Sequence, residues 1–428
     1  MRALFVFLLT VAFYILAQGT GHPVLFHLFY TLASTLVVCY LWAWLSLRGL
    51  EIRREVLTPR TQVGRYMEEH LLVRNQSLWP KLWVEVQDIT DLPGHHPRFV
   101  TGLPARTSRH SRLRTICTLR GKYTLGPLLL RSSDPLGLFR LQKRLDDLAE
   151  VLVYPATEEV YGFLLPPAEL PGGTAARQRT HHTTPNVSGV REYIPGDSFN
   201  RIHWPSTARH GRLIVKEFEL DPSADIWLVL DLERKVQQSV LWRERRPDQP
   251  EVRTPASTEE YAVTAAASLA RYLILTQRRN TGLIAWGQYQ EVIPPEREPR
   301  QFFRILESLA SLRAHGRTPL AEVLAAEGNR FGRQSCLVVI TPSFDPDWVR
   351  VGLRELLYGG VYAVVVLVDG LTFGGVHDLD AVRAELTAHN VPHYLLRNGE
   401  PIGPALSSAA GLVAWQQGAR YVGEHYRA

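Results

Sequence analysis

The densest charged stretch of the chain is REYIPGDSFNRIHWPSTARHGRLIVKEFE, which runs from Arg191 to Glu219. It holds five Lys or Arg residues, four Asp or Glu residues and two histidines. Carboxylates, imidazoles and guanidinium groups at this density suit either acid–base chemistry on an anionic substrate or a network of ion pairs. The first question is therefore whether the stretch forms a catalytic site or a structural brace.

A cluster of Asp197, His203 and Arg209 is the catalytic or anion-binding alternative, and it would make the protein a hydrolase-type enzyme. The sequence contains no GxSxG elbow, no HExxH motif, no GxxxxGK[ST] loop and no GxGxxG motif after a strand. Ion-pair networks place charges together just as active sites do. We therefore favour the brace, and we expect no enzyme activity and no cofactor.

Asp231 ends the apolar segment DIWLVLDLE, at a place where open α/β sheets often carry a ligand residue. A metal-dependent adhesion site would need hydroxyl groups two and four residues further on, because magnesium prefers hard oxygen ligands. The sequence has Glu233 and Lys235 at these positions. We expect no functional metal site, although a metal-dependent adhesion module remains a third alternative.

Residues 221–428 alternate between apolar strands and amphipathic helices. The predicted strands are DIWLVLDLE, TGLIAWG, SCLVVIT, VYAVVVLVD and PHYLLR, and the predicted helices cover residues 257–278, 301–312, 320–326, 347–357 and 378–390. This alternation predicts an α/β domain with a mostly parallel sheet and helices on both faces.

Residues 49–160 contain short alternating segments separated by turn signals, which predicts a small antiparallel β domain. Within it, RGKYTLGPLLLRSSDPLGLFR is expected to form two strands with a Gly-Pro break and an Asp-Pro-Leu-Gly turn. Residues 161–188 are rich in Pro and Gly and are expected to be a linker or mobile loop. Residues 189–220 then form the charged segment that precedes the α/β domain.

Two apolar runs precede residue 48, Ala3–Ala17 and Val24–Leu47, and the second is long enough to cross a bilayer. A cleaved signal peptide is the competing interpretation of the first run. We favour a transmembrane hairpin over residues 1–48, because a second apolar run follows at once. Arg2, Arg48 and nearby arginines flank the hairpin, which predicts that both termini and the soluble domains are cytoplasmic.

Charge and cysteine content exclude other classes of protein. The net charge of +6 comes from 48 basic and 42 acidic residues, without a run dense enough for nucleic-acid binding. The three cysteines are far apart, so neither a disulfide framework nor a zinc site is expected. The bilayer and other proteins remain as the expected partners.

The run GVREYIPGDSFNRIHWPSTARHGRLIVKEFE resembles the signature of the bacterial family called "domain of unknown function 58", through RxYxxGD, RIxW and an AR before an LxV strand. The likeness extends to nearly the whole chain through RGxYxLGP, DPxGLF, VLVYP, STEEYAVTAAASLARYL, GLIAWG and the paired N-terminal helices. The resemblance marks a set of signature residues with a structural role: Arg191, Tyr193, Gly196, Asp197, Arg201, Trp204, Ala208 and Arg209.

The resemblance implies a membrane protein of the bacterial cell membrane with a β domain and a von Willebrand factor type A-like domain. Asp231 and Thr318 match two of five metal-ligand positions of that wider fold, so we assign them to partner binding and expect only a degenerate metal site. Such proteins are often found with MoxR-type AAA+ ATPases and transglutaminase-like membrane proteins. We therefore expect an adaptor that works with partners of this kind.

Overall fold

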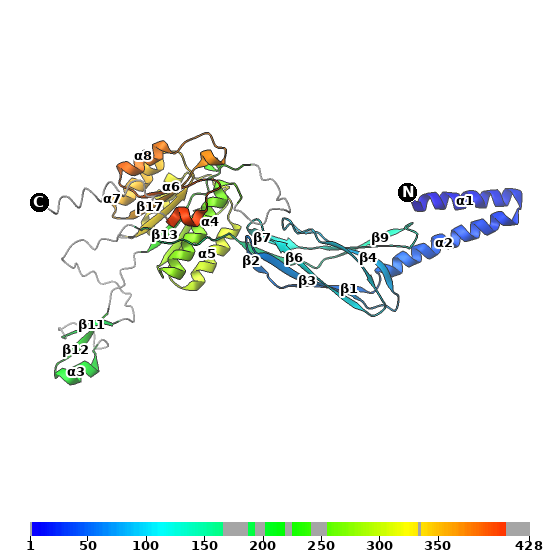
Figure 1. The fold of residues 1–428 in the computed structure, drawn as a ribbon, viewed down its shortest axis with the longest axis horizontal. Coiled ribbons are helices and arrows are strands. Elements are labelled where there is room, and N and C mark those ends of the chain that lie inside the picture. Colours follow the sequence, from blue (N-terminus) through cyan, green and yellow to red (C-terminus); the bar gives the residue numbers. More distant parts are fainter. Residues whose placement is uncertain are drawn as a thin grey trace.

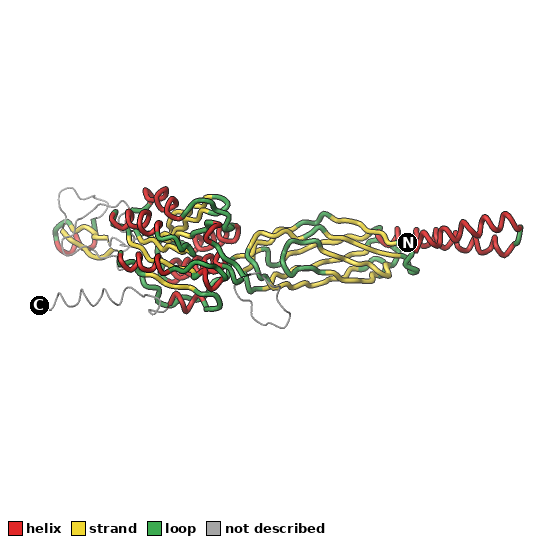
Figure 2. Tube along the Cα trace, turned by 90° about the horizontal axis from the view of Figure 1, so that it is seen from above, coloured by secondary structure: helices red, strands yellow, loops and turns green. Residues whose placement is uncertain are grey.

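The computed structural model describes residues 2–165, 187–192, 202–218, 225–240, 255–332 and 335–407. Two long helices, a β domain and an α/β domain follow one another along the long axis of the molecule (Figure 1). Seen from above, the β domain forms a stalk between the helices and the α/β domain (Figure 2). The predicted combination of apolar N-terminal helices, antiparallel β sheets and a mostly parallel sheet is confirmed.

Helix α1 (Arg2–Thr20) and helix α2 (Pro23–Leu47) form a hairpin. Gly21 turns the chain with a φ of 69°, and Pro23 lies in the first turn of α2, where a missing N–H costs nothing. Both helices are long and apolar enough to cross a membrane, and only 11% and 6% of their most apolar windows are buried within the protein. Core helices of a soluble domain would be covered, whereas these two leave their apolar surface outside the fold.

The β domain contains ten strands. They are β1 (Leu50–Val56), β2 (Arg60–Gln62), β3 (Tyr66–Asn75), β4 (Lys81–Asp88), β5 (Arg98–Leu103), β6 (Ser108–Ile116), β7 (Gly121–Leu125), β8 (Leu128–Ser133), β9 (Arg140–Leu145) and β10 (Ala149–Tyr154). They form the sheets β1-β3-β6, β5-β4-β8-β9 and β2-β10-β7, in which all pairs are antiparallel except β2 with β10. The first two sheets share a core that includes Leu71, Val84 and Leu130, so this part is a sandwich.

The α/β domain is built on one six-stranded sheet. Its strands are β13 (Ile226–Leu230), β14 (Thr281–Trp286), β15 (Gln290–Glu296), β16 (Cys336–Thr341), β17 (Tyr362–Val368) and β18 (His393–Leu396). The order is β15-β14-β13-β16-β17-β18, and every pair is parallel except β14 with β15. Strand β15 was not predicted; its segment Gln290–Glu296 holds two prolines, which are tolerated because the strand lies at the side of the sheet.

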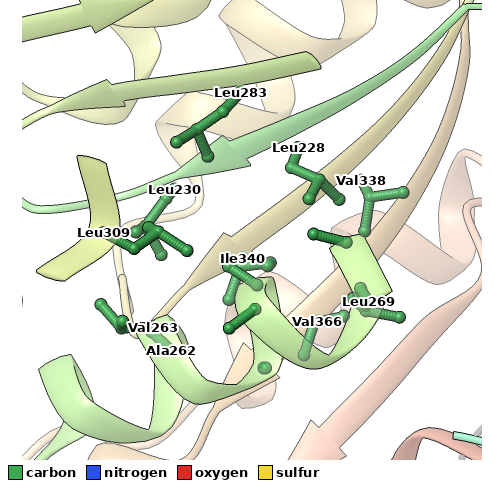
Figure 3. Close-up of a cluster of buried hydrophobic side chains, with 14 of the residues drawn as sticks. Leu228, Leu230, Ala262, Val263, Leu269, Leu283, Leu309, Val338, Ile340 and Val366 are labelled. Carbon is green, nitrogen blue, oxygen red and sulfur yellow. The ribbon is translucent and has the colours of Figure 1, made fainter. Parts of the chain in front are cut away.

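Helices cover both faces of this sheet because successive strand residues point to opposite sides. The helices of one face are α4 (Thr258–Ala270), with its π-helical extension Arg271–Thr276, α5 (Pro299–Ser311) and α9 (Ile402–Ser407). Those of the other face are α6 (Leu320–Glu327), the π-helical turn Trp348–Leu353 with α7 (Arg354–Tyr358), and α8 (Asp380–Ala388). Figure 3 shows Leu228, Leu230 and Ile340 of the first face directed at α4. The short helix α9 was not predicted.

The start of the predicted linker packs against the α/β domain. The ring of Phe163 stacks on Tyr394 with 4.8 Å between centroids, and the N–H of Leu164 donates to the Tyr394 hydroxyl at 3.0 Å. The N–H of Tyr161 donates to the hydroxyl of Ser407 at 2.7 Å. Residues 166–186 of the predicted linker lie outside the described residues.

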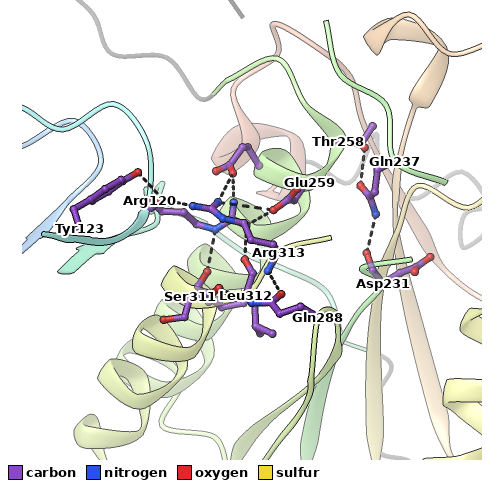
Figure 4. A network of polar contacts seen from close by, with 12 residues as sticks. Arg120, Tyr123, Asp231, Gln237, Thr258, Glu259, Gln288, Ser311, Leu312 and Arg313 are labelled. Carbon is purple, nitrogen blue, oxygen red and sulfur yellow. Dashed lines mark hydrogen bonds and ion pairs between the residues drawn. The ribbon is translucent and has the colours of Figure 1, made fainter. Parts of the chain in front are cut away.

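Arg120, in the loop before β7, joins the β domain to the α/β domain (Figure 4). Its side chain is fully buried, and its Nε donates to the carbonyl of Leu309 at 2.9 Å. Nη2 donates to the carbonyl of Leu312 at 2.9 Å and to Glu259 at 2.6 Å, and Nη1 pairs with Glu260. The last carbonyls of a helix have no partner within it, so this guanidinium satisfies the end of α5 while it neutralises two carboxylates at the start of α4.

Arg313 and Tyr123 complete this joint from either side. Arg313 Nη2 donates to the carbonyl of Arg120 at 2.7 Å, and Arg313 Nη1 lies 3.4 Å from Glu260. The Tyr123 hydroxyl also donates to the carbonyl of Arg120, at 3.1 Å. An arginine of each domain therefore donates hydrogen bonds to backbone carbonyls of the other domain, Arg120 from the β domain and Arg313 from the α/β domain.

Replacing Arg120 tests the joint. Arg120→Ala should remove the buried guanidinium that pairs with Glu259 and Glu260, and it leaves Arg313 beside both carboxylates. Because Arg313 compensates part of the charge, we expect a loss below the about 3–5 kcal/mol of a fully broken buried ion pair. We expect calorimetry of the detergent-solubilised chain to show the β and α/β domains melting separately, with faster proteolysis between them. Lys122→Ala is the control, because Lys122 is 59% exposed and pairs with an exposed glutamate; it should change stability by less than about 0.5 kcal/mol. Identical melting of both variants would contradict the joint.

Candidate functional site

Asp231 lies directly after β13 and is only 4% exposed. Its Oδ1 accepts the backbone N–H of Glu233 at 3.0 Å, and its Oδ2 accepts the hydroxyl of Thr341 at 2.6 Å. Thr341 ends the neighbouring strand β16, so the two side chains meet where the carboxyl ends of adjacent parallel strands meet. The predicted position of Asp231, at the carboxyl end of the first strand of the α/β domain, is confirmed.

Burial raises the pKa of Asp231 to about 6, against the hydrogen bonds from Thr341 and the Glu233 N–H, which lower it. The charge of Glu233 adds to the increase. No Lys or Arg forms an ion pair with Asp231 in the part of the chain that the structure describes. Among the residues that the structure describes, the buried carboxyl is therefore held without a neutralising cation.

A second carboxylate, Glu233, lies beside Asp231 and is 7% exposed. Burial raises the pKa of Glu233, Lys235 lowers it, and Asp345 and Glu322 raise it further. These side chains come from the loop after β13, the loop after β16 and helix α6. The edge of the sheet around Asp231 is thus acidic in its centre, with one exposed lysine close to Glu233.

Hydrogen bonds connect Asp231 to the joint between the domains (Figure 4). The carbonyl of Asp231 accepts the side-chain N–H of Gln237 at 3.1 Å, and Gln237 accepts the hydroxyl of Thr258 at 2.7 Å. Thr258 begins helix α4, and the next residue is Glu259, a partner of Arg120. The position of the Asp231 loop is therefore set by the same helix that receives the β domain.

Gly316 brings a second loop to this edge. Its N–H donates to the carbonyl of Leu232 at 3.0 Å, and a Cβ at this position would lie 2.8 Å from that carbonyl and 2.5 Å from the carbonyl of Trp286. Only glycine allows so close an approach. Thr318 follows on the same loop and is half-buried, but it is not a hydrogen-bond partner of Asp231 among the described residues.

The described residues do not assemble an evident magnesium site at this edge. Both carboxylate oxygens of Asp231 already accept hydrogen bonds, and the charge of Lys235 acts on Glu233, which occupies one of the expected hydroxyl positions. Thr341 provides a hydroxyl where the wider fold is expected to have an aspartate. The absence of a resident metal remains a prediction.

The charged segment forms a small strand–helix–strand unit. Strand β11 (Val187–Glu192) pairs antiparallel with β12 (Ile214–Phe218), with Arg191 opposite Val215, and helix α3 (Trp204–His210) lies between them in sequence. Trp204 is 65% exposed, and Ala208 and Arg209 are also exposed. Of the other signature residues, Tyr193, Gly196, Asp197 and Arg201 lie outside the described residues.

His203 is engaged within its own turn. Its Nδ1 lies 2.7 Å from the hydroxyl of Ser206, and its backbone N–H donates to the carbonyl of Ile214 at 2.8 Å. These contacts hold the start of α3 against β12, which is a structural role. The proposed ion pairs of the brace and the catalytic cluster with Asp197 both remain predictions.

A buried charge cluster in the β domain was missed by sequence reasoning. Arg54 Nη2 pairs with Asp88 at 2.8 Å, Arg54 Nε lies 3.6 Å from Glu69, and His95 Nε2 lies 3.1 Å from Glu69. All four side chains are at most 1% exposed. Glu69, Asp88 and His95 are close enough to hold a metal ion, but the guanidinium of Arg54 already provides a cation between the carboxylates.

Protonation of His95 completes the charge balance of this cluster. Burial opposes the charged imidazole, but hydrogen bonds to Asp88 and Glu69 outweigh it and raise the pKa of His95. Two cations then face two carboxylates. No local sequence motif predicts this cluster, because its four residues are separated along the chain.

Residues 189–369 match a family described as "Protein of unknown function DUF58". The chain is also 24% identical over 373 residues to "Uncharacterized protein YeaD" of Bacillus subtilis (strain 168), which covers 84% of this chain and 86% of the relative. The resemblance that the signature predicted is thereby confirmed for residues 189–369. Neither comparison names an activity.

Solved structures match only part of the chain. The CARDB domain of the PF1109 protein from Pyrococcus furiosus is 14% identical, covers 24% of this chain and 91% of that chain, and has a TM-score of 0.19. A β-glucosidase from Listeria innocua is 11% identical, covers 24% of this chain and 16% of that chain, and has a TM-score of 0.18. Likenesses this weak carry no argument about function.

The buried carboxyl of Asp231 gives a test of the site's electrostatics. Its pKa in the folded chain, about 6, is above the ordinary value of 3.8. The unfolded chain therefore loses this proton first as the pH rises, and the fold is destabilised progressively between about pH 4 and pH 6, by about 3 kcal/mol in total. Asp231→Asn removes this cost, so we expect a higher melting temperature than wild type at pH 8 and no gain at pH 4.

Asp225→Asn is the matched control. Asp225 is exposed and lies just before β13, at the opposite end of this strand from Asp231. It should change the free energy of unfolding by less than about 0.5 kcal/mol at either pH. A lower melting temperature for Asp231→Asn at pH 8 would show that the ionised carboxylate is instead stabilising.

Proposed function

We propose that this chain, which matches DUF58 proteins over residues 189–369, is a membrane-anchored, cytoplasm-facing adaptor that binds another protein at the loop edge around Asp231. The carrying observation is that Asp231 is buried at the carboxyl end of β13, where it is held by hydrogen bonds from Thr341 and the Glu233 N–H and forms no ion pair among the described residues. Groups held in such an unfavourable place are concentrated at functional sites. The loops at the carboxyl ends of parallel strands are also where such sheets usually bind partners.

The edge around Asp231, which we call the Asp231 edge, comprises residues 231–240, 313–319, 342–346 and 369–379. Its loops are in contact: the rings of Phe344 and His377 stack at 4.0 Å, and a Cβ on Gly375 would lie 3.1 Å from the side chain of Gln238. The edge is thus one continuous surface and not a set of separate loops.

Exposed apolar and basic side chains share this surface. Val376 is 82% exposed, Val240 is 47% exposed and Leu371 is 45% exposed. Arg234 and Lys235 are exposed beside them. Asp345 and Asp378 are exposed on the same surface. A mixture of apolar, cationic and acidic side chains on adjoining loops suits a protein interface better than a small-molecule pocket.

Membrane anchorage is supported by α1 and α2, which are apolar, long and largely uncovered. The cations at Arg2 and Arg48 support an orientation with the soluble domains in the cytoplasm. For the α/β domain we propose a von Willebrand factor type A-like identity, which the doubly wound strand order and the place of Asp231 support. Under that proposal the partners are a MoxR-type AAA+ ATPase and a transglutaminase-like membrane protein.

A hydrolase acting through the Arg191–Glu219 segment is the alternative. His203 would be its base, but the described contacts of His203 serve the start of α3. We therefore place this alternative second.

Affinity purification tests the adaptor proposal. We expect the tagged chain, solubilised from native membranes, to recover an AAA+ ATPase in a nucleotide-dependent manner. The variant Lys235→Glu/Val376→Asp alters one cation and one apolar side chain of the Asp231 edge. It should reduce recovery about tenfold, which corresponds to about 1.4 kcal/mol of binding free energy.

The control variant is Arg354→Glu/Tyr358→Asp, which makes the same kind of change at the opposite edge of the sheet, where Tyr358 is 85% exposed. It should recover the ATPase as wild type does. Recovery of no AAA+ protein with or without ATP would overturn this partner, and equal recovery with both variants would overturn the Asp231 edge as its binding surface.

A further inference from the structure

The end of the β sandwich next to α2 is formed by three loops. The register places Asn75 opposite Leu50, Lys81 opposite Leu103, and Ser133 opposite Arg140, so the strand ends at these residues share one end of the domain. We call residues 75–81, 103–108 and 133–140 the membrane-proximal rim.

Helix α2 is fixed to this rim by its last turns. The ammonium group of Lys81, a residue only 2% exposed, donates to the carbonyl of Leu45 in the last turn of α2, which also accepts the backbone N–H of Arg48. The ring of Tyr40 meets Phe139 at 5.6 Å, and the ring of Trp42 meets Trp79 at 5.3 Å. The sandwich is therefore docked on the helix and does not hang from a free linker.

The lengths of the two helices place the rim at the surface of a bilayer. Trp42 lies about 20 residues after the start of α2, which is the length needed to cross a hydrocarbon core of about 30 Å. Arg2, at the start of α1, lies at the same level, because a Cβ on Gly137 would be 3.7 Å from its guanidinium. The ring pair of Trp42 and Trp79 thus falls at the boundary between acyl chains and headgroups.

The side chains of the rim suit this boundary. Leu78 is 73% exposed, Leu136 is 61% exposed and Trp79 is 42% exposed, although all three are apolar or aromatic. Tryptophan and leucine next to arginine are typical of segments that lie in the interfacial layer.

Exposed basic residues predominate near the rim, although the half-buried Glu51 accepts a hydrogen bond from Gln76 of the rim. Arg106 and Arg140 lie on its loops, Arg48 follows α2, and all three are exposed. The one acidic residue of the rim loops, Asp134, is buried and accepts the backbone N–H groups of Leu136 and Phe139. Arginines at this level attract anionic headgroups, at about 1 kcal/mol each near the surface.

We propose that the membrane-proximal rim is itself a membrane-binding surface, with Leu78, Trp79 and Leu136 inserted at the acyl-chain boundary and the arginines on anionic phospholipid headgroups. This inference rests on the membrane anchorage in the proposed function. Its consequence is that the β domain stands on the bilayer at a fixed tilt, so that the Asp231 edge is held away from the membrane.

Fluorescence quenching by brominated lipids tests this inference on the full chain in lipid nanodiscs. The native residues Cys39, Cys117 and Cys336 are all buried, so single exposed cysteines can be labelled selectively. Labels at Leu78→Cys and Leu136→Cys should lose fluorescence when phosphatidylglycerol-containing discs carry brominated chains. A label at Tyr66→Cys, which is 58% exposed at the far end of β3, should lose none.

A label at Val37→Cys, on the exposed face of α2, tests the membrane anchor independently of the rim. Quenching at Val37 without quenching at Leu78 or Leu136 would overturn the rim proposal and leave the anchor intact. Absence of quenching at Val37 would overturn the anchor, and with it the proposed function. Quenching at the rim should weaken when phosphatidylcholine replaces phosphatidylglycerol; equal quenching in both would overturn the role of the arginines.

Discussion

The buried guanidinium of Arg120 is the interaction on which the arrangement of the domains depends. The side chain of Arg120 extends from the β domain into the α/β domain. There it donates hydrogen bonds to backbone carbonyls at the end of α5 and forms ion pairs with two carboxylates at the start of α4. Both of these elements lead to the Asp231 edge, α4 through Thr258 and Gln237 and α5 through the loop that contains Gly316. The β domain, which continues from α1 and α2, therefore packs on the same elements that shape the candidate site.

Three buried polar clusters differ in whether their carboxylates are paired with cations. We assign a structural role to the two paired clusters and a functional role to the unpaired one. The cluster around Arg120 and the cluster around Arg54 each pair cations with carboxylates. Asp231 has hydrogen bonds but no cation among the described residues, and its pKa is raised to about 6. Balanced clusters fix the packing of the domains, whereas an unbalanced acid at a loop edge is a cost to stability that a function can explain.

The sequence predicted the parts of the fold that depend on local patterning. Five apolar strands and the helices between them lie close to their predicted positions, because periodicity is a local property. Strand β15 was not predicted, because its two consecutive prolines are typical of a loop. The role of Arg120 could not be predicted, although its motif RGKYTLGP was recognised, because its hydrogen-bond partners are 139 to 192 residues away in the sequence. The place of Asp231 directly after a strand could be predicted because it depends on local patterning, and its role in partner binding stays a prediction. That it forms no ion pair among the described residues depends on the folded neighbourhood and could not be predicted.

The central claim is that a stalk on the membrane presents the Asp231 edge to a partner protein, and site-specific photo-crosslinking in intact cells tests it most directly. With a photoreactive amino acid at Val376, which is 82% exposed on this edge, the account predicts a discrete crosslink to one protein. The same probe at Tyr358, on the opposite edge, should give none. Equal crosslinking from both positions, or none from Val376 when the protein is folded and in the membrane, would contradict the account.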